Sequence, residues 1–250
     1  MRVLITGHSR GLGAALARGV LARGGAVWGL SRRPLSPPPV TEPDRFFETA
    51  LDLRDLPALL RFVAPPPLRD WFAGADTAVL VNNAGVLGPV GPPGRLEEEG
   101  IESAVALDLV VPLLLTSSFV RATEGCPDRR VVHVSSGAAR HPVAGWSVYG
   151  PCKAALDHHA RTVAADSVPG LRIASVAPGV LDTDMQAEVR DLDPSRFPES
   201  RRFHDLHRQG LLVPPADAAG RFLDYVLSDA FGEEAAVDLR RLPGRDARRG

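Results

Sequence analysis

The chain has 250 residues, 44% of them hydrophobic, and its formal net charge at pH 7 is −1. This length suits one large domain with a sizeable core, and the near-zero charge provides no general basic surface for nucleic acid. We expect no signal peptide, and we expect no apolar run as long as the roughly 18 residues that span a bilayer. Cys126 and Cys152 lack the spacing of a disulfide framework or a zinc site. We therefore expect a cytoplasmic protein that binds no nucleic acid, membrane or metal.

Apolar runs alternate with amphipathic stretches along the whole chain. We expect strands at 2–6, 26–31, 47–51, 78–82, 130–135, 171–177 and 235–239. Such alternation is typical of parallel strands joined by crossover helices. It predicts a single α/β domain over residues 1–250, a Rossmann-type, doubly wound, mostly parallel seven-stranded sheet with helices on both faces. Ligands then bind at the carboxyl ends of the strands.

The first strand runs into a glycine-rich turn and then into a helix rich in alanine and leucine. Glycines let the backbone turn tightly and approach a pyrophosphate, and the start of a helix offers free N–H groups. This position between the first strand and the first helix is where a dinucleotide site needs such a turn. We assign to the cofactor Gly7, Ser9, Arg10, Gly11, Leu12 and Gly13.

The second strand ends in Ser31, followed by Arg32 and Arg33, where an NAD site would place an acid. Arginine can hold a 2′-phosphate through paired, charge-assisted hydrogen bonds. We expect Arg10 to project towards the same region. These cations favour NADPH over NADH, and the alternative is that Arg32 and Arg33 are only solvated.

Two further strand ends carry candidate cofactor contacts. Asp52 and Leu53 follow the third strand, where they could border the adenine. Asn83, Ala84 and Gly85 follow the fourth strand. An Asn-Ala-Gly run can be a simple turn, but its place after a central strand favours contact with the cofactor.

Lys153 is the only lysine among the 29 basic residues, and it lies four positions after Tyr149. Residues four apart share one face of a helix. A cation close to a phenol lowers the tyrosine pKa from about 10, which would make Tyr149 a proton donor and acceptor. The alternative is a helix in which the tyrosine packs and the lysine is solvated.

The connection 181–212 is long and rich in charge and proline, which is typical of a lid or binding loop. We expect it to cover a substrate. Within it, His204 and His207 are expected to be surface residues and not metal ligands. The basic tail 240–250 is expected to be solvated and frayed.

Several motifs occur in a fixed order: Thr-Gly-x-x-x-Gly-x-Gly, Asn-Asn-Ala-Gly, Ser136, Tyr149-x-x-x-Lys153 and Pro178-Gly179. With them the chain resembles the short-chain dehydrogenases/reductases over nearly its whole length. The resemblance implies that Tyr149 is the general acid and that Ser136 steadies the substrate oxygen. It implies that Lys153 binds the nicotinamide ribose and tunes the phenol. It also implies cofactor contacts from Pro178, Gly179, Val180 and Thr183, the last of them to the carboxamide.

A narrower resemblance, to the branch of sepiapterin and benzil reductases, rests on the runs 135–138, 145–146, 177–186 and 237–239. It implies that NADPH reduces a vicinal diketone or a side-chain ketone, and that Trp146, Met185 and Asp238 contact the substrate. Asp238 matches an aspartate that anchors the pterin in sepiapterin reductases, although an aspartate there can also be only a strand cap. Phe197, Phe203, Leu211 and Leu212 could join Trp146 in an apolar pocket for a bulky ketone, or could only pin the connection to the core.

Asp108 departs from the pattern of the family, in which most relatives have an asparagine at this position of a central helix. By resemblance, the carbonyl of that asparagine holds a water in a proton relay that starts at the lysine. An aspartate lacks the amide donor and adds negative charge near Lys153, which opposes formation of a phenolate. We expect activity to survive with a shifted pH optimum.

The predicted function is that of an NADPH-dependent carbonyl reductase acting on a small-molecule ketone or diketone. Two alternatives remain open: a non-catalytic NADP(H)-binding regulator, because one fold hosts many functions, and an NADP-dependent alcohol dehydrogenase. Relatives associate through long central helices, so the resemblance implies a homodimer, with a homotetramer as the alternative.

Overall fold

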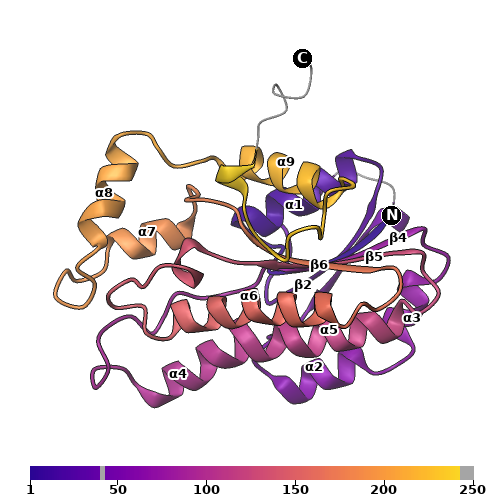
Figure 1. The fold of residues 1–250 in the computed structure, drawn as a ribbon, viewed down its shortest axis with the longest axis horizontal. Helices are drawn as coiled ribbons and strands as arrows, with labels where there is room; N and C mark the ends of the chain where they lie inside the picture. The colour runs from indigo at the N-terminus through magenta and orange to yellow at the C-terminus, as the bar shows by residue number, and fades with distance from the viewer. Residues whose placement is uncertain (40–42, 243–250) are drawn as a thin grey trace.

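The computed structural model describes residues 1–39 and 43–242, and one seven-stranded sheet runs through them (Figure 1). The strands are β1 (Arg2–Thr6), β2 (Ala26–Ser31), β3 (Phe46–Ala50), β4 (Thr77–Asn82), β5 (Asp128–Val134), β6 (Leu171–Ala177) and β7 (Ala236–Asp238). All neighbours pair in parallel, in the order β3-β2-β1-β4-β5-β6-β7. The predicted doubly wound parallel sheet is therefore confirmed.

Helices cover both faces of the sheet (Figure 1). They are α1 (Gly11–Ala22), α2 (Leu56–Val63), α3 (Pro67–Phe72), α4 (Glu98–Val105), α5 (Val111–Ala122), α6 (Tyr149–Ala165), α7 (Asp184–Arg190), α8 (Ser200–Arg208) and α9 (Pro215–Val226). Short turns of other helix types are η1 (Pro43–Arg45), η2 (Ala106–Val110), η3 (Gly137–Ala139) and η4 (Leu239–Arg241). Helices α1 and α9 pack together on one face, and α2, α3, α5 and α6 lie on the other.

Each central strand contributes side chains to two hydrophobic cores, one on each face of the sheet. In β1, Val3 and Ile5 belong to the core under α1 and α9, whereas Leu4 belongs to the core under α5 and α6. Successive side chains of a strand point to opposite faces, and both faces are buried here, so the strand reads as an unbroken apolar run. This packing explains why the central strands are recognisable in the sequence.

The order of the strands reverses beside β1, which pairs with β2 on one side and with β4 on the other. Loops that leave the carboxyl ends of β1 and β4 diverge to opposite faces, so a crevice forms between them. The loops after β5 and β6 reach the same edge of the sheet because all these strands are parallel. The fold therefore gathers the predicted site residues at one edge.

One helical segment contradicts the expectation that no apolar run in the chain is long enough to span a membrane. The stretch Glu98–Ala122 is long and apolar enough, by length and composition alone, to cross a bilayer. Its apolar character is explained by the fold, because Val111, Leu115 and Phe119 are buried in the core against the sheet. A helix that packs on a sheet needs the same residue types as one that lies in lipid. The run is therefore a core helix of this domain.

The connection 181–212 is not an extended loop, since it contains α7 and α8, which project beyond the carboxyl edge of the sheet (Figure 1). Its two ends are joined: the amide of Asp182 donates to the carbonyl of Val213 at 2.9 Å, and the amide of Val213 donates to that of Val180 at 2.9 Å. Val189 and Phe197 are fully buried within it. The connection is therefore a small folded cap.

Candidate active site

The glycines at the turn between β1 and α1 are required by close packing or by backbone conformation. An added Cβ at Gly13 would lie 2.2 Å from the carbonyl oxygen of Gly7, and Gly7 and Gly11 have φ angles of +67° and +54°. Glycine adopts such angles without the steric cost that other residues meet. The turn therefore brings the first N–H groups of α1 against the end of β1, which is the geometry that binds a pyrophosphate.

Asn83 ties the end of β4 to this turn. Its side-chain nitrogen donates to the carbonyl of Thr6 at 2.9 Å and to that of Gly7 at 3.1 Å. The backbone amides of Asn83 and Ala84 donate to the hydroxyl of Thr6 at 2.9 and 3.0 Å. The Asn-Asn-Ala-Gly run thus holds the glycine turn in shape as well as bordering it.

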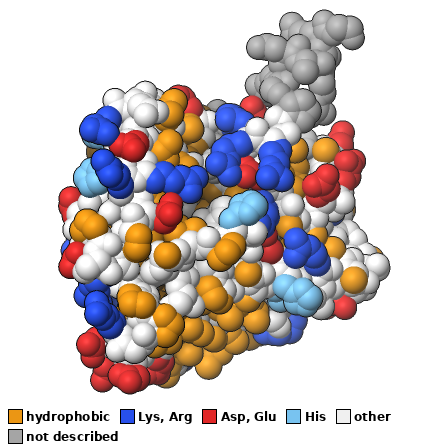
Figure 2. Space-filling view, turned by 60° about the vertical axis from the view of Figure 1, so that its left-hand side comes forward, with side chains coloured by type: hydrophobic (Ala, Val, Ile, Leu, Met, Phe, Trp, Pro, Cys, Tyr) orange, Lys and Arg blue, Asp and Glu red, His pale blue; other side chains and the backbone are white. Residues whose placement is uncertain are grey.

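A cleft of about 750 Å³ opens at the carboxyl ends of the strands. It is lined by every residue that the sequence analysis assigned to the cofactor, and by Ser136, Trp146 and Met185. Asp108 and Asp238 are outside this lining. Figure 2 turns the side with α7 and α8 towards the viewer, with basic side chains across its upper half and hydrophobic ones below. The glycine turn and the cleft together fit a dinucleotide.

At the end of the cleft beside β2, basic residues predominate. Arg32 and Arg33 are exposed and line it. Asp52 also lines it, but Arg54 contacts its carboxylate at 2.7 Å. This hydrogen bond lowers the pKa of Asp52 to about 2, because Arg54 stabilises the ionised form. The negative charge of Asp52 is therefore compensated by a neighbour.

Arg10 does not point where the sequence analysis expected it. Its guanidinium contacts Asp184 at 3.0 Å and Glu188 at 3.8 Å, both on α7. The sequence analysis expected Arg10 to project towards the region of Arg32, but in the structure its guanidinium pairs with these carboxylates, although Arg10 and Arg32 line the same cleft. Carboxylates on α7 were not recognisable as partners because more than 170 positions separate them from Arg10.

Ser136, Tyr149 and Lys153 converge on one wall of the cleft. Tyr149 begins α6 and Lys153 follows one turn later, with Nζ 5.6 Å from the centre of the tyrosine ring. Both are buried, and Nζ donates to the carbonyl of Val134 at 3.1 Å. Ser136 caps η3, where its Oγ accepts a hydrogen bond from the amide of Ala138, and it also hydrogen-bonds Tyr149. The phenol and the amine are on the same side of α6.

The pKa of Tyr149 is raised, not lowered as the sequence analysis expected. Burial is the main cause, because a phenolate loses its hydration inside the protein. Lys153 and the hydrogen bond from Ser136 both act in the opposite direction, and the charge of Asp108 adds to the rise. The expectation considered the charges of Lys153 and Asp108 but not burial, because burial cannot be read from the spacing of residues.

Asp108 lies on η2, a single π-type turn between α4 and α5, and is 1% exposed. Its Oδ1 accepts a hydrogen bond from the amide of Val86 at 2.9 Å, whereas its buried Oδ2 has no hydrogen-bond partner among the described residues. Burial raises the pKa of Asp108, and Lys153 opposes that rise. An added Cβ at Gly85 would lie 3.2 Å from Oδ1 and 3.3 Å from the Nζ of Lys153. Asp108 and Lys153 therefore both lie close to the backbone of Gly85.

An aromatic cluster forms the far end of the cleft. The ring of Trp146 stacks on that of Phe197 with centroids 5.1 Å apart, and its edge meets Tyr149 at 5.2 Å. Trp146, Phe203 and Met185 line the cleft, whereas Phe197 is fully buried. The sequence analysis offered two interpretations of these residues, a substrate pocket or attachment of the connection to the core. Both apply, because some of the residues border the cleft and others hold the cap in place. Leu211 is 56% exposed and does neither.

Asp238 ends β7 and is held by Arg240. The Nε and Nη2 of Arg240 contact the Asp238 carboxylate at 3.0 and 2.6 Å. Arg240, not Asp238, lines the cleft. Residues 243–250 of the expected basic tail lie outside the described residues, but Arg240 within η4 is not a free tail residue. Sequence reasoning missed Arg240, and its only signal is an arginine two positions after an aspartate at a strand end.

Other cleft residues that the sequence analysis did not assign include Arg54, His141 and Arg202. Within residues 1–39 and 43–242, no group of three or more His, Cys, Asp or Glu side chains is arranged to hold a metal ion. His204 lies near the carbonyl of Arg190, with its Nε2 2.9 Å from that oxygen.

The fold and the cleft define an oxidoreductase of the dinucleotide-binding class, and comparison with known proteins agrees. The model of the short chain dehydrogenase family matches residues 1–193. The benzil reductase ((S)-benzoin forming) of Bacillus cereus is 32% identical, covering 94% of this chain and 98% of the relative. The sepiapterin reductase of Meriones unguiculatus is 35% identical, covering 94% and 95%. The chain therefore belongs to the short-chain dehydrogenase family.

A solved structure agrees with this membership. A short-chain dehydrogenase/reductase from Burkholderia vietnamiensis is 42% identical, with a TM-score of 0.70, over 97% of this chain and 98% of that one. The similarity to the branch of benzil and sepiapterin reductases that the sequence suggested is thus confirmed. Members of this family bind NAD(H) or NADP(H).

Proposed function

We propose that the protein is an NADPH-dependent carbonyl reductase that reduces a ketone or one carbonyl of a vicinal diketone. The observation that carries the proposal is the convergence of Ser136, Tyr149 and Lys153 on one wall of a cleft that also contains the glycine turn. The names of two relatives, a benzil reductase and a sepiapterin reductase, support this class of substrate.

The proposed roles follow from charge development during reduction. NADPH, when bound, supplies a hydride to the carbonyl carbon. Tyr149 donates its phenolic proton to the carbonyl oxygen as negative charge grows there, and Ser136 donates a second hydrogen bond to the same oxygen. Lys153 stabilises the phenolate that remains, which offsets part of the cost of burying it.

The preference for NADPH over NADH rests on charge beside β2. Arg32 and Arg33 line the cleft there, and Asp52 is already bound by Arg54. A 2′-phosphate would find cations at this end, whereas the ribose of NADH would find no free acid. Kinetics with the two cofactors test this step, and equal kcat/KM values for NADPH and NADH would contradict it.

Turnover is tested by following the absorbance of NADPH with benzil and with sepiapterin as substrates. We expect oxidation of NADPH that depends on the ketone. Tight binding of NADPH without turnover of either ketone would favour the non-catalytic regulator. Faster reaction of NADP⁺ with alcohols than of NADPH with ketones at neutral pH would favour an alcohol dehydrogenase.

We also propose a cytoplasmic homodimer. Support for a reducing compartment comes from Cys126 and Cys152, which are both free thiols. Support for association comes from Leu113 on α5, a large apolar side chain that is 37% exposed on the helix Glu98–Ala122.

A further inference from the structure

Arg240 is held in a defined position at the wall of the cleft. Its Nε contacts Asp238 Oδ1 at 3.0 Å and its Nη2 contacts Oδ2 at 2.6 Å. The side chain of Asp238 is 6% exposed, whereas that of Arg240 is 52% exposed. The hydrogen bonds from Arg240 hold the pKa of Asp238 below its usual value. The carboxylate is thus the buried anchor, and the guanidinium is the part that borders the cleft.

The side chain of Arg240 bridges the loops that follow β5 and β6. An added Cβ at Gly179 would lie 3.6 Å from both Cγ and Cδ of Arg240, and one at Gly137 would lie 3.8 Å from its Nη2. Gly137 directly follows Ser136, whose hydroxyl belongs to the proposed proton-donating wall. The guanidinium therefore lies beside the loop that carries Ser136, within the cleft that Ser136 and Tyr149 also line.

The ion pair with Asp238 leaves some N–H groups of Arg240 without a hydrogen-bond partner among the described residues. Only Nε and Nη2 bond to Asp238, and Nη1 has no hydrogen-bond partner among the described residues. A guanidinium is planar, so the groups that bind Asp238 fix the direction of the remaining N–H groups. Hydrogen bonds from such a cation to an oxygen are stronger than neutral ones.

We propose that Arg240 is a substrate-recognition residue, which donates a hydrogen bond to a second oxygen adjacent to the carbonyl that is reduced. The inference rests on the proposed function and narrows its substrate class to 1,2-dicarbonyl compounds. The second oxygen belongs to a ketone or to a carboxylate. Asp238 acts through Arg240 as a positioning residue and does not itself touch the substrate.

A matched pair of substrates isolates this oxygen. Benzil has two adjacent carbonyls, and deoxybenzoin has the same two rings but a methylene in place of one carbonyl. Loss of a hydrogen bond to a charged donor costs about 10- to 100-fold in rate. We expect Arg240→Ala to lower kcat/KM for benzil by about that factor and to leave kcat/KM for deoxybenzoin nearly unchanged. Comparing variant with parent for each ketone cancels the greater intrinsic reactivity of benzil.

Arg241→Ala is the matched control, because Arg241 is the next residue of η4, is exposed and is not among the cleft residues. It should change neither rate. Because Arg240→Ala leaves a buried carboxylate unpaired, the double variant Asp238→Asn/Arg240→Gln provides a second test with both charges removed. It should show the same selective loss on benzil.

Equal losses on benzil and deoxybenzoin in both Arg240 variants would overturn the role of Arg240 and leave the reductase intact. Failure of the parent protein to reduce either ketone would instead overturn the proposed function, and the inference with it. Phenylglyoxylate, which has a carboxylate next to its ketone, distinguishes the two kinds of second oxygen. If Arg240→Ala lowers kcat/KM more for phenylglyoxylate than for benzil, Arg240 recognises a carboxylate oxygen. If the loss is greater for benzil, Arg240 recognises a ketone oxygen.

Discussion

At the scale of single residues, the reactivity of Tyr149 depends on opposing effects. Burial raises the pKa of the phenol, and Lys153 and Ser136 counter that rise. Because the phenol stays protonated at neutral pH, it suits the proposed role of acid in the reduction of a ketone. The charge of Asp108 also raises the pKa of Tyr149, so it should affect how the reaction rate depends on pH.

Tyr149→Phe should lower kcat/KM for ketone reduction by about 10²- to 10⁴-fold, because the positioned proton is lost. Binding of NADPH, measured by fluorescence titration, should be unchanged. The matched control is Tyr225→Phe, since Tyr225 is the only other tyrosine and lies on α9, in the core on the face of the sheet that α1 and α9 cover. Reductase activity that survives in Tyr149→Phe would show that another group donates the proton.

Asp108→Asn should shift the alkaline limb of the pH–rate profile. The carboxylate of Asp108 raises the pKa of Tyr149, so its removal lowers that pKa. Reduction needs the protonated phenol, and the rate of reduction should therefore begin to fall at a lower pH than in the parent protein. The measurement is kcat/KM against pH for both proteins, and superimposable profiles would exclude this coupling.

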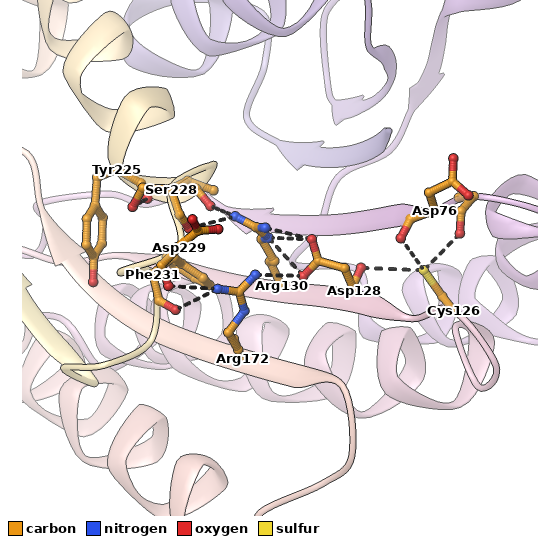
Figure 3. Close-up of polar contacts among 11 residues, drawn as sticks. Asp76, Cys126, Asp128, Arg130, Arg172, Tyr225, Ser228, Asp229 and Phe231 are labelled. Atoms are coloured by element: carbon orange, nitrogen blue, oxygen red, sulfur yellow. Dashed lines mark hydrogen bonds and ion pairs between the residues drawn. The ribbon is translucent and has the colours of Figure 1, made fainter.

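At the scale of secondary structure elements, polar side chains at the amino ends of β5 and β6 join the sheet to the segment after α9 (Figure 3). Asp128 contacts Arg130 at 2.7 Å and Arg172 at 3.0 Å. Arg130 also donates to the carbonyls of Val226 and Ser228. These contacts lie at the edge of the sheet opposite to the cleft, so they affect stability without touching the site.

Asp128→Asn should lower the free energy of unfolding at pH 7 by about 2–3 kcal/mol, because Arg130 is nearly buried and loses its ionic partner. Burial acts to raise the pKa of Asp128, but Arg130 and Arg172 together hold it below its usual value. A lowered carboxyl pKa stabilises the fold above the unfolded value of about 3.9, and this contribution is lost as the pH falls through the folded pKa.

The difference in the free energy of unfolding between Asp128→Asn and the parent protein should therefore become smaller below about pH 4. Chemical denaturation at several pH values measures this free energy for both proteins. Asp229→Asn serves as the control, because Asp229 is exposed in the same network and contributes its backbone carbonyl. A difference that stays constant down to low pH would mean that the charge of Asp128 is not what stabilises the fold.

At the scale of the whole molecule, the helix Glu98–Ala122 has two apolar sides. One packs against the sheet, and the other includes the exposed Leu113. Leu113→Glu should weaken the proposed homodimer, because a charge in an apolar interface loses its hydration. Light scattering should give twice 26.7 kDa for the parent and a lower mass for the variant. A monomeric parent protein would contradict the proposed dimer.

Most of the fold could be predicted because its signals are local in the sequence. The central parts of β4, β5 and β6 are buried on both faces, so each strand contains a short apolar run between turns. The glycines after β1 are required by backbone geometry. Tyr149 and Lys153 share one face of α6 because they are one turn apart.

Other features were decided only by the tertiary structure. The pKa of Tyr149 depends on burial by segments distant in the chain. Arg10 turns to carboxylates on α7, and Arg240 replaces Asp238 at the wall of the cleft. The sequence by itself determined the alternation of strands and helices, the glycine turn and the spacing of the three proposed catalytic groups, since those follow from periodicity and backbone sterics. Long-range packing set the electrostatics and the shape of the substrate end, because charges and exposed surfaces act through space and not along the chain.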